Sequence, residues 1–127
     1  MIHDGARPFL TPDLIEDGLK IVGEIGAAVA AVPVKDTIKL TDSEKLIKET
    51  LQRDRLWAAQ TPQIFSFDVI TRAYENLTTE VTDDATAVER LGHKVQLYMG
   101  DYKNIKVTTA EDLALARIIA GEWKEKN

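Results

Sequence analysis

The chain has 127 residues, of which 44% are hydrophobic and 29% are charged, and its formal net charge at pH 7 is −5. This size and composition predict one soluble globular domain, and the acidic balance argues against a general nucleic-acid-binding protein, because such domains usually carry a basic surplus. There is no cysteine, no apolar run long enough to span a bilayer and no signal peptide before the first motif, so we expect a cytoplasmic protein without disulfides, thiolate metal sites or membrane contact.

The first motif lies between a predicted strand end and a predicted helix start. Ile2-His3 has the pattern of a strand end, and Thr11-Pro12 supplies an N-cap followed by a proline at the first helical position. In open α/β sheets, ligand sites lie at such strand-to-helix crossings. A strand this close to residue 1 has no earlier element with which to pair. We therefore expect the chain to be a fragment of a larger fold.

A helix and a buried strand follow this motif. Apolar residues recur at helical spacing from Leu14 to Ile25, and Gly26 is placed to end the helix. The continuous small and apolar run over residues 27–34 predicts a strand that is buried on both faces. A helix followed by a buried strand indicates a parallel crossover unit and hence an α/β fold.

The segment over residues 35–55 differs from the rest, because it contains six basic and five acidic residues and few apolar ones. Residues 37–40 and 46–51 predict two strands joined by a polar turn. An isolated two-stranded hairpin is only marginally stable in water. We expect a projecting β-hairpin arm that packs on its own domain or on a partner subunit, and the low apolar content favours the partner.

Beyond the arm, residues 56–63 lead back to the body and further α/β elements follow. The expected elements are a helix capped by Ser66 with an apolar face of Phe67, Ile70, Ala73, Tyr74 and Leu77, a helix capped by Thr82 or Asp83 and closed by Gly92, a strand over 95–99, an extended segment over 104–107, and a last helix opened by a capping box at 109–112.

Several polar residues fall next to predicted strand ends or helix starts. If the strands are parallel, Asp4, Arg7, Thr61, Thr82 and Lys106 converge at one edge of the sheet. Arg7 and Lys106 are suited to neutralising a phosphate, and the two threonines offer hydroxyl groups. Asp4 is suited to binding sugar hydroxyls or a divalent ion.

Each of these residues also has a plainer interpretation. Asp4-Gly5 is typical of a turn, with Arg7 as its surface ion pair. Thr82 is a good helix cap, and Lys106 is an ordinary exposed lysine. His3 is more often a structural histidine than a catalytic base. Spacing alone does not decide between these alternatives.

Five strings, taken in order, resemble the C-terminal half of the 2-C-methyl-D-erythritol 4-phosphate cytidylyltransferase family. They are HDGARPF, AAVPVKDTIK, TLQRDRLWAAQTPQIF, VTDDATAVERLG and NIKVTTAEDLALA. The resemblance implies a truncated Rossmann-like nucleotidyltransferase fold. Residues 1–127 would form the C-terminal part of a single cytidylyltransferase domain, and residues 35–55 would form an arm used for homodimerisation.

The resemblance also implies an activity. The family joins CMP from CTP to methylerythritol phosphate and releases pyrophosphate, with Mg²⁺, in the non-mevalonate route of isoprenoid biosynthesis. The reaction is an in-line attack of the substrate phosphate on the α-phosphorus of CTP, which depends on positioning and charge neutralisation. The implied partners are therefore two small-molecule substrates and a second copy of the chain.

Residue roles carry over by motif. Asp4 and Arg7 would contact the methylerythritol part of the substrate, with Asp4 also able to help place Mg²⁺. Thr37 and Arg53 lie on the arm and would reach the substrate of the neighbouring subunit, with Arg53 on its phosphate.

The remaining implied contacts are Thr61, Thr82 and Lys106, which would complete the pocket, with Lys106 near the phosphate. Arg53, Lys106 and Asp4 are thus the implied catalytic residues. Arg55 is a close alternative to Arg53. The family usually has Asp where this chain has Gln52, which weakens any ion pair there without touching the proposed contacts.

One departure from the family pattern affects function. The glycine-rich loop that wraps the CTP triphosphate in the family has no counterpart among the scattered glycines of this chain. We therefore expect the chain alone to be inactive. Two alternatives stay open, namely a fragment of a ribitol 5-phosphate cytidylyltransferase and a non-catalytic dimerisation module.

Overall fold

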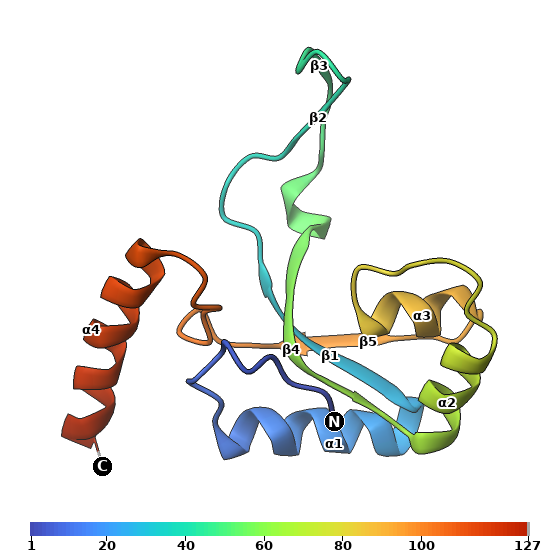
Figure 1. Cartoon of the computed structure of the whole chain (residues 1–127), viewed down its shortest axis with the longest axis horizontal. Helices are drawn as coiled ribbons and strands as arrows, with labels where there is room; N and C mark the ends of the chain where they lie inside the picture. The colour runs from blue at the N-terminus through green and yellow to red at the C-terminus, as the bar shows by residue number, and fades with distance from the viewer. Residues whose placement is uncertain (127) are drawn as a thin grey trace.

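The computed structural model describes residues 1–126, which form a three-stranded sheet in the order β4-β1-β5 and a separate two-stranded hairpin (Figure 1). The central strand is β1 (Ala27–Pro33). On one side β4 (Trp57–Phe65) runs antiparallel to it, and on the other side β5 (Gln96–Met99) runs parallel to it. The predicted α/β class is confirmed, although the sheet is mixed.

Both faces of β1 are covered, as its continuous apolar sequence predicts. Its alternate residues pack on one face against α2 (Phe67–Glu75) and α3 (Asp84–Arg90). Its other residues pack on the opposite face against α1 (Pro12–Ile25). Figure 1 shows α1 on the side of the sheet away from α3. The sheet therefore lies between two helical layers, which fixes the strand ends and the loops attached to them.

The boundaries of α1 follow from local chemistry. Thr11 is extended, and its side-chain oxygen accepts a hydrogen bond from Leu14 N at 3.4 Å. Gly26 ends the helix at φ +89°, and its N–H donates to Val22 O at 2.9 Å. A glycine adopts this left-handed conformation at little cost. The predicted cap and stop are both confirmed.

The strand β4 was predicted only as a link back to the body. Its pairing with β1 is interrupted, because Val29 pairs with Gln63 whereas Ala31 already pairs with Ala59. The intervening residues 60–62 bulge out of the strand. Such bulges re-aim side chains and are frequent beside active sites. This bulge breaks the alternation of polar and apolar residues by which a strand is recognised in sequence.

Two predicted extended segments are not strands. Ile2 forms only one isolated antiparallel bridge, with Gln63. Residues 104–107 run as a loop, in which Val107 N donates to Ala6 O at 2.8 Å. A backbone hydrogen bond therefore links the N-terminal segment to this loop, although neither forms a helix or a strand.

The predicted apolar face of α2 is partly wrong. Phe67 is 80% exposed, and the buried residues are Val69 and Ala73. Residues two positions apart lie on nearly opposite sides of a helix, whereas residues four apart share a face. Once Val69 faces the core, Phe67 is turned to solvent.

The hairpin arm is confirmed as a structural element. It consists of β2 (Lys39–Thr41) and β3 (Ile47–Thr50), and a 3-10 helix, η1 (Arg53–Arg55), connects it to β4. The arm projects from the body, as Figure 1 shows. Every residue of both strands is exposed.

The last helix, α4 (Ala110–Lys126), begins with the predicted capping box. Thr109 Oγ1 accepts from Asp112 N at 3.2 Å, and Asp112 Oδ2 accepts from Thr109 N at 3.0 Å. The helix lies beside the sheet and packs its Ala116 and Ile119 on Phe9. Within residues 1–126, no helix has the length and apolar character needed to cross a bilayer.

Candidate functional site

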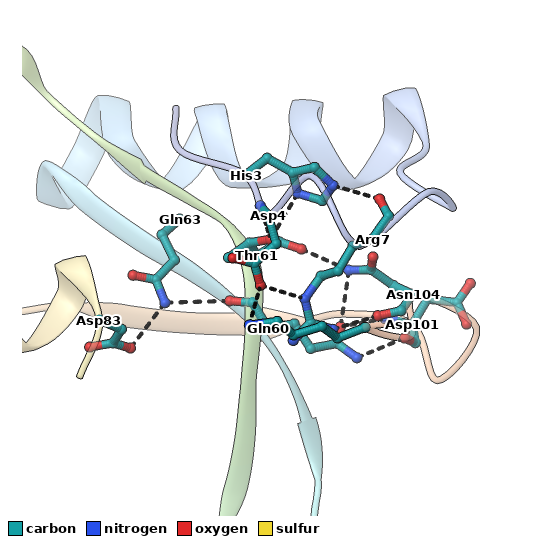
Figure 2. A network of polar contacts seen from close by, with 10 residues as sticks. His3, Asp4, Arg7, Gln60, Thr61, Gln63, Asp83, Asp101 and Asn104 are labelled. Carbon is teal, nitrogen blue, oxygen red and sulfur yellow. Dashed lines mark hydrogen bonds and ion pairs between the residues drawn. The ribbon is translucent and has the colours of Figure 1, made fainter. Parts of the chain in front are cut away.

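The loop over residues 3–7 is a tight turn that is closed by its own groups. Arg7 N donates to Asp4 O at 3.0 Å, and His3 Nε2 lies 2.9 Å from Arg7 O. A carbonyl oxygen only accepts, so Nε2 carries the proton and donates. Figure 2 shows the His3 ring spanning this turn. The structural interpretation of His3 fits these contacts, because its ring holds the loop that carries Asp4 and Arg7.

Thr61 ties this loop to the bulge of β4. Its Oγ1 accepts from Asp4 N at 3.0 Å and lies 2.9 Å from His3 Nδ1. In the tautomer in which Nε2 carries the only ring proton, Nδ1 accepts and the Thr61 hydroxyl donates. The single proton of this hydroxyl is therefore already used. Thr61 lines the cleft described below, and its chief contacts there hold the loop in place.

Two cations converge on the carboxylate of Asp4. Arg7 Nε lies 3.2 Å and Lys106 Nζ lies 3.5 Å from Asp4 Oδ2. The Arg7 side chain is 12% exposed, whereas that of Lys106 is 51% exposed. An ion pair as open to solvent as that of Lys106 with Asp4 is worth only about 0–1 kcal/mol. The cluster therefore holds two cationic head groups close to a single carboxylate.

These charges line an open cleft of ≈ 350 Å³. Its walls come from the first loop, the bulge of β4, the start of α3 and the loop over 104–107. Among the predicted site residues, the cleft brings together Asp4, Arg7, Thr61, Thr82 and Lys106. The expected convergence occurs, but by a different route. The residues come from loops and from a bulge in an antiparallel strand, and not from the ends of parallel strands.

The opposite wall is the capped start of α3. Asp83 is the cap, because its Oδ1 accepts from Thr86 N at 2.8 Å. Gln63 is buried and bridges to this helix, since its Nε2 donates to Asp83 Oδ2 at 3.0 Å and its Oε1 accepts from Ala85 N at 2.9 Å. Thr82 is exposed beside the cap and is free of the capping role.

The pKa of Asp83 reflects this setting. Burial alone raises the pKa, but hydrogen bonds from the side chain of Thr86, from Gln63 and from the backbone of Thr86 together outweigh burial and lower the pKa below its usual value. The carboxylate therefore stays charged at neutral pH. The cleft therefore has a fixed negative charge on the wall opposite Arg7 and Lys106.

The arm residues do not join this cleft within one chain. Thr37 and Arg53 are both exposed, and neither lines the cleft. Arg53 Nη1 donates to Lys35 O at 2.8 Å, near the base of the arm. Arg55, the alternative to Arg53, is exposed on the same 3-10 helix.

The described residues do not by themselves make a magnesium site. Within residues 1–126, no group of three or more His, Asp or Glu side chains is placed to hold a metal ion. Asp4, the proposed ligand, has one carboxylate oxygen that is already shared by Arg7 and Lys106. At Asp4, Mg²⁺ would therefore compete with two cations for the carboxylate.

Two buried polar residues, which the residue pattern does not mark as buried, lie behind the cleft. Gln60 is 7% exposed and Asn104 is fully buried, and Figure 2 shows both beneath Thr61 and Arg7. Arg7 Nη1 donates to Asn104 O at 2.7 Å. In the sequence Asn104 stands in a polar turn after Tyr102 and Lys103, which gives no sign that it is buried.

Comparisons with known proteins agree with this architecture. The family model for 2-C-methyl-D-erythritol 4-phosphate cytidylyltransferase matches residues 1–122. The enzyme of that name from Alkaliphilus oremlandii is 48% identical over 98% of this chain and 54% of its own length. The one from Dehalococcoides mccartyi strain CBDB1 is 50% identical over 94% of this chain and 52% of its own length.

Solved structures give the same result for the fold. The Thermus thermophilus cytidylyltransferase superposes with a TM-score of 0.82 at 34% identity, covering 93% of this chain and 59% of that structure. The 4-diphosphocytidyl-2C-methyl-D-erythritol synthase of Anaerococcus prevotii gives 0.85 at 34% identity, covering 94% and 57%. The predicted Rossmann-like nucleotidyltransferase fold is thereby confirmed. The chain spans about half the length of these relatives, and it belongs to the 2-C-methyl-D-erythritol 4-phosphate cytidylyltransferase family.

Proposed function

We propose that this chain supplies the polyol-phosphate half of a cytidylyltransferase site. The observation that carries the proposal is the convergence of Arg7 and Lys106 on Asp4 in one open cleft. Asp4 accepts hydrogen bonds from substrate hydroxyls, and the ammonium group of Lys106 binds the phosphate. Methylerythritol phosphate, the substrate named for the relatives, has both kinds of group.

The role of the cleft in the reaction is to hold the nucleophile. A phosphate oxygen of the substrate forms a bond to the α-phosphorus of CTP, the bond from that phosphorus to the bridging oxygen of the β-phosphate breaks, and pyrophosphate leaves. Lys106 is 51% exposed and its ammonium has three donors, so it reaches a ligand while keeping its contact with Asp4. Arg7 is pinned on two sides and fixes the orientation of the polyol.

A homodimer through the arm completes the proposed site. The arm exposes the large apolar side chains of Leu40, Leu46 and Ile47, each by about half or more. A two-stranded hairpin with such a surface is marginal alone and gains stability from a partner. In the dimer, Thr37 and Arg53 would reach the cleft of the neighbouring subunit.

The dimer has a direct test. We expect the double substitution of Leu46→Glu with Ile47→Glu to give a monomer by light scattering, because it puts charge into the apolar contact. Lys48→Glu, on the same strand, is the matched control and should leave the dimer intact. A dimer that persists in the double variant would exclude the arm as its interface.

We propose further that the chain alone does not transfer CMP. It has no run of glycines suited to wrapping a triphosphate, and within residues 1–126 no group of three or more acidic or histidine side chains is placed to hold Mg²⁺. The triphosphate and any Mg²⁺ would then be held by groups outside the cleft. Pyrophosphate release from CTP by the pure chain, at the rate of a full-length relative, would contradict this.

Calorimetric titration with methylerythritol phosphate tests the proposed function, with ribitol 5-phosphate as the competing ligand. We expect the first ligand to bind more tightly. Tighter binding of ribitol 5-phosphate would favour the other cytidylyltransferase, an alternative that the names of the relatives do not favour. A stable dimer that binds neither compound would indicate a dimerisation module.

A further inference from the structure

A buried amide lies directly behind the two cations of the cleft. The Asn104 side chain is fully buried, and its Nδ2 donates to Thr61 O at 2.7 Å and to Gln60 Oε1 at 3.3 Å. Both acceptors belong to the bulge of β4. Figure 2 shows Asn104 reaching under this bulge from the loop that follows β5. One side chain thus joins the loop to the sheet.

The same loop is fastened at its start by Gln60. Gln60 Nε2 donates to Asp101 O at 2.9 Å, and Asn104 N donates to Asp101 O at 2.9 Å. This approach depends on Gly100, because a Cβ at that position would lie 2.4 Å from Gln60 Oε1. The turn over residues 101–104 is therefore held in one conformation by side chains of β4.

This turn sets the positions of both cations. The backbone oxygen of Asn104 accepts from Arg7 Nη1 at 2.7 Å, while the opposite side of that guanidinium is held by Asp4. Lys106 follows two residues later, on a segment that is fixed again where Val107 N meets Ala6 O at 2.8 Å. The distance between the Arg7 and Lys106 head groups therefore depends on where Asn104 holds the loop.

The two polar atoms of the Asn104 side chain differ in their contacts. Among residues 1–126, the Asn104 Oδ1 atom has no hydrogen-bond partner although it is buried. Buried acceptors of this kind are rare and costly, and an apolar side chain here would in turn remove the donor from Thr61 O and Gln60 Oε1. The gain that offsets the cost is the pair of donor contacts made by Nδ2.

We propose that Asn104 is a positioning residue for the polyol-phosphate site. Its carboxamide holds the carbonyl that orients Arg7 and the segment that aims Lys106, so that the two cations are correctly spaced before the ligand arrives. This inference rests on the proposed function of the cleft. Asn104 does not itself touch the ligand, so its effect on binding passes through Arg7 and Lys106.

Asn104→Ser tests the proposal in the full chain, with Asn76→Ser as the matched control. Asn76 also donates a side-chain bond to a backbone oxygen, that of Arg72, but it is exposed on the far end of α2. We expect Asn104→Ser to raise the calorimetric Kd for methylerythritol phosphate about tenfold, which is the loss of roughly one hydrogen bond, and Asn76→Ser to leave it unchanged.

To distinguish a positioning role of Asn104 from a purely structural one, the Asn104→Ser and Asn76→Ser substitutions are repeated in a chain that already carries Arg7→Ala. If Asn104 acts mainly through Arg7, adding Asn104→Ser to the Arg7→Ala chain should change Kd by less than about threefold. In that chain Lys106 is the cation whose position still depends on Asn104. An undiminished effect in that background, or an unchanged Kd in Asn104→Ser itself, would overturn the proposal. Failure of the parent chain to bind the ligand would instead refute the proposed function on which this inference rests.

A measurement on the parent protein keeps the proposal testable even if Asn104→Ser does not fold. We expect the Arg7 Nε–H signal in NMR spectra to exchange slowly with water in the absence of ligand, compared with the Nε–H signal of the exposed Arg72. Equal exchange rates for the two side chains would show that Arg7 is not held in advance and would overturn the proposal.

Discussion

Arg7 and Arg53 are the same residue type in opposite settings. Arg7 is 12% exposed at its side chain and is held between the Asp4 carboxylate and the Asn104 carbonyl. Arg53 is exposed on the arm, where its contact is a single bond to the carbonyl of Lys35. The cleft is thus organised within one chain, whereas the arm carries side chains that its own body does not use.

This difference separates two tasks of the proposed site. A pre-organised cation loses little freedom on binding and contributes affinity directly. An exposed cation on a projecting arm contributes only after a neighbouring subunit has been brought close. Substitutions in the cleft should therefore have larger effects than substitutions on the arm.

The largest effect should come from Arg7→Ala. It removes a charged donor from the cleft and leaves Asp4 and the Asn104 carbonyl without it, so we expect the Kd for methylerythritol phosphate to rise about 10- to 150-fold, or about 1.5–3 kcal/mol. Calorimetry measures this. Arg72→Ala, on the surface of α2, should bind as the parent does, and equal loss in both variants would mean that only net charge counts.

Gln63→Leu should have the next largest effect, on stability. It keeps the side-chain volume but leaves Ala85 N–H unsatisfied and removes a donor from Asp83. We expect the free energy of unfolding to fall by about 1–3 kcal/mol, measured by urea denaturation. Gln96→Leu, at an exposed position of β5, should change it by less than about 0.5 kcal/mol. An equal loss of stability in Gln63→Leu and Gln96→Leu would contradict a special role of Gln63 in holding the wall of the cleft.

Asp83→Asn should have a smaller, pH-dependent effect. The folded-state pKa of Asp83 is lowered, so its charge stabilises the fold above the unfolded pKa of about 3.9 and this contribution is lost as pH falls through the folded pKa. Asparagine keeps the capping oxygen without the charge. Between about pH 5 and 3, we expect urea denaturation to show an acid-induced loss of stability smaller by up to about 1 kcal/mol.

The control for that measurement is Asp68→Asn, which lies exposed in the first turn of α2. It should leave the acid-induced loss as large as in the parent. A loss that is identical in Asp83→Asn and in the parent would show that the hydrogen bonds to Asp83 do not favour its charged form.

Arg53→Ala should have the smallest effect on stability. Its side chain is exposed and makes one bond within the arm, so the free energy of unfolding should change by less than about 0.5 kcal/mol. Its effect on ligand binding should nevertheless be clear in the dimer. A large loss of stability in thermal unfolding would mean that Arg53 stabilises the fold of its own chain. It would contradict the view that Arg53, unlike Arg7, acts on a neighbouring subunit.

The sequence predicts those parts of the fold that depend on neighbouring residues. Thr11 and Gly26 bound α1, and Thr109 with Asp112 opens α4, because caps are set by local backbone chemistry. The strand β4 was not predicted, since its bulge at residues 60–62 disrupts the strand pattern. Because β4 runs antiparallel to β1, the cleft residues come from loops and from the bulge, and not from the ends of parallel strands as predicted.

For the site, the motifs identified the cleft residues but not what holds them. Asp4, Arg7 and Lys106 stand in recognisable strings, and they do meet in space. Gln60 and Asn104 support them through contacts more than 40 residues away in sequence. Burial of a polar side chain depends on the whole fold, and neither residue type nor spacing reveals it.

The central claim is that the cleft of one chain is completed by the arm of another, and a mixing experiment tests it. Arg7→Ala damages the cleft and Arg53→Ala damages the arm, so each variant alone should bind methylerythritol phosphate poorly. After subunit exchange, half of the dimers should contain one of each variant, and each of these has one intact site. We expect the mixture to recover about one quarter of the parent's binding capacity by calorimetry. A mixture that binds no more ligand than the two variants measured separately would contradict the claim.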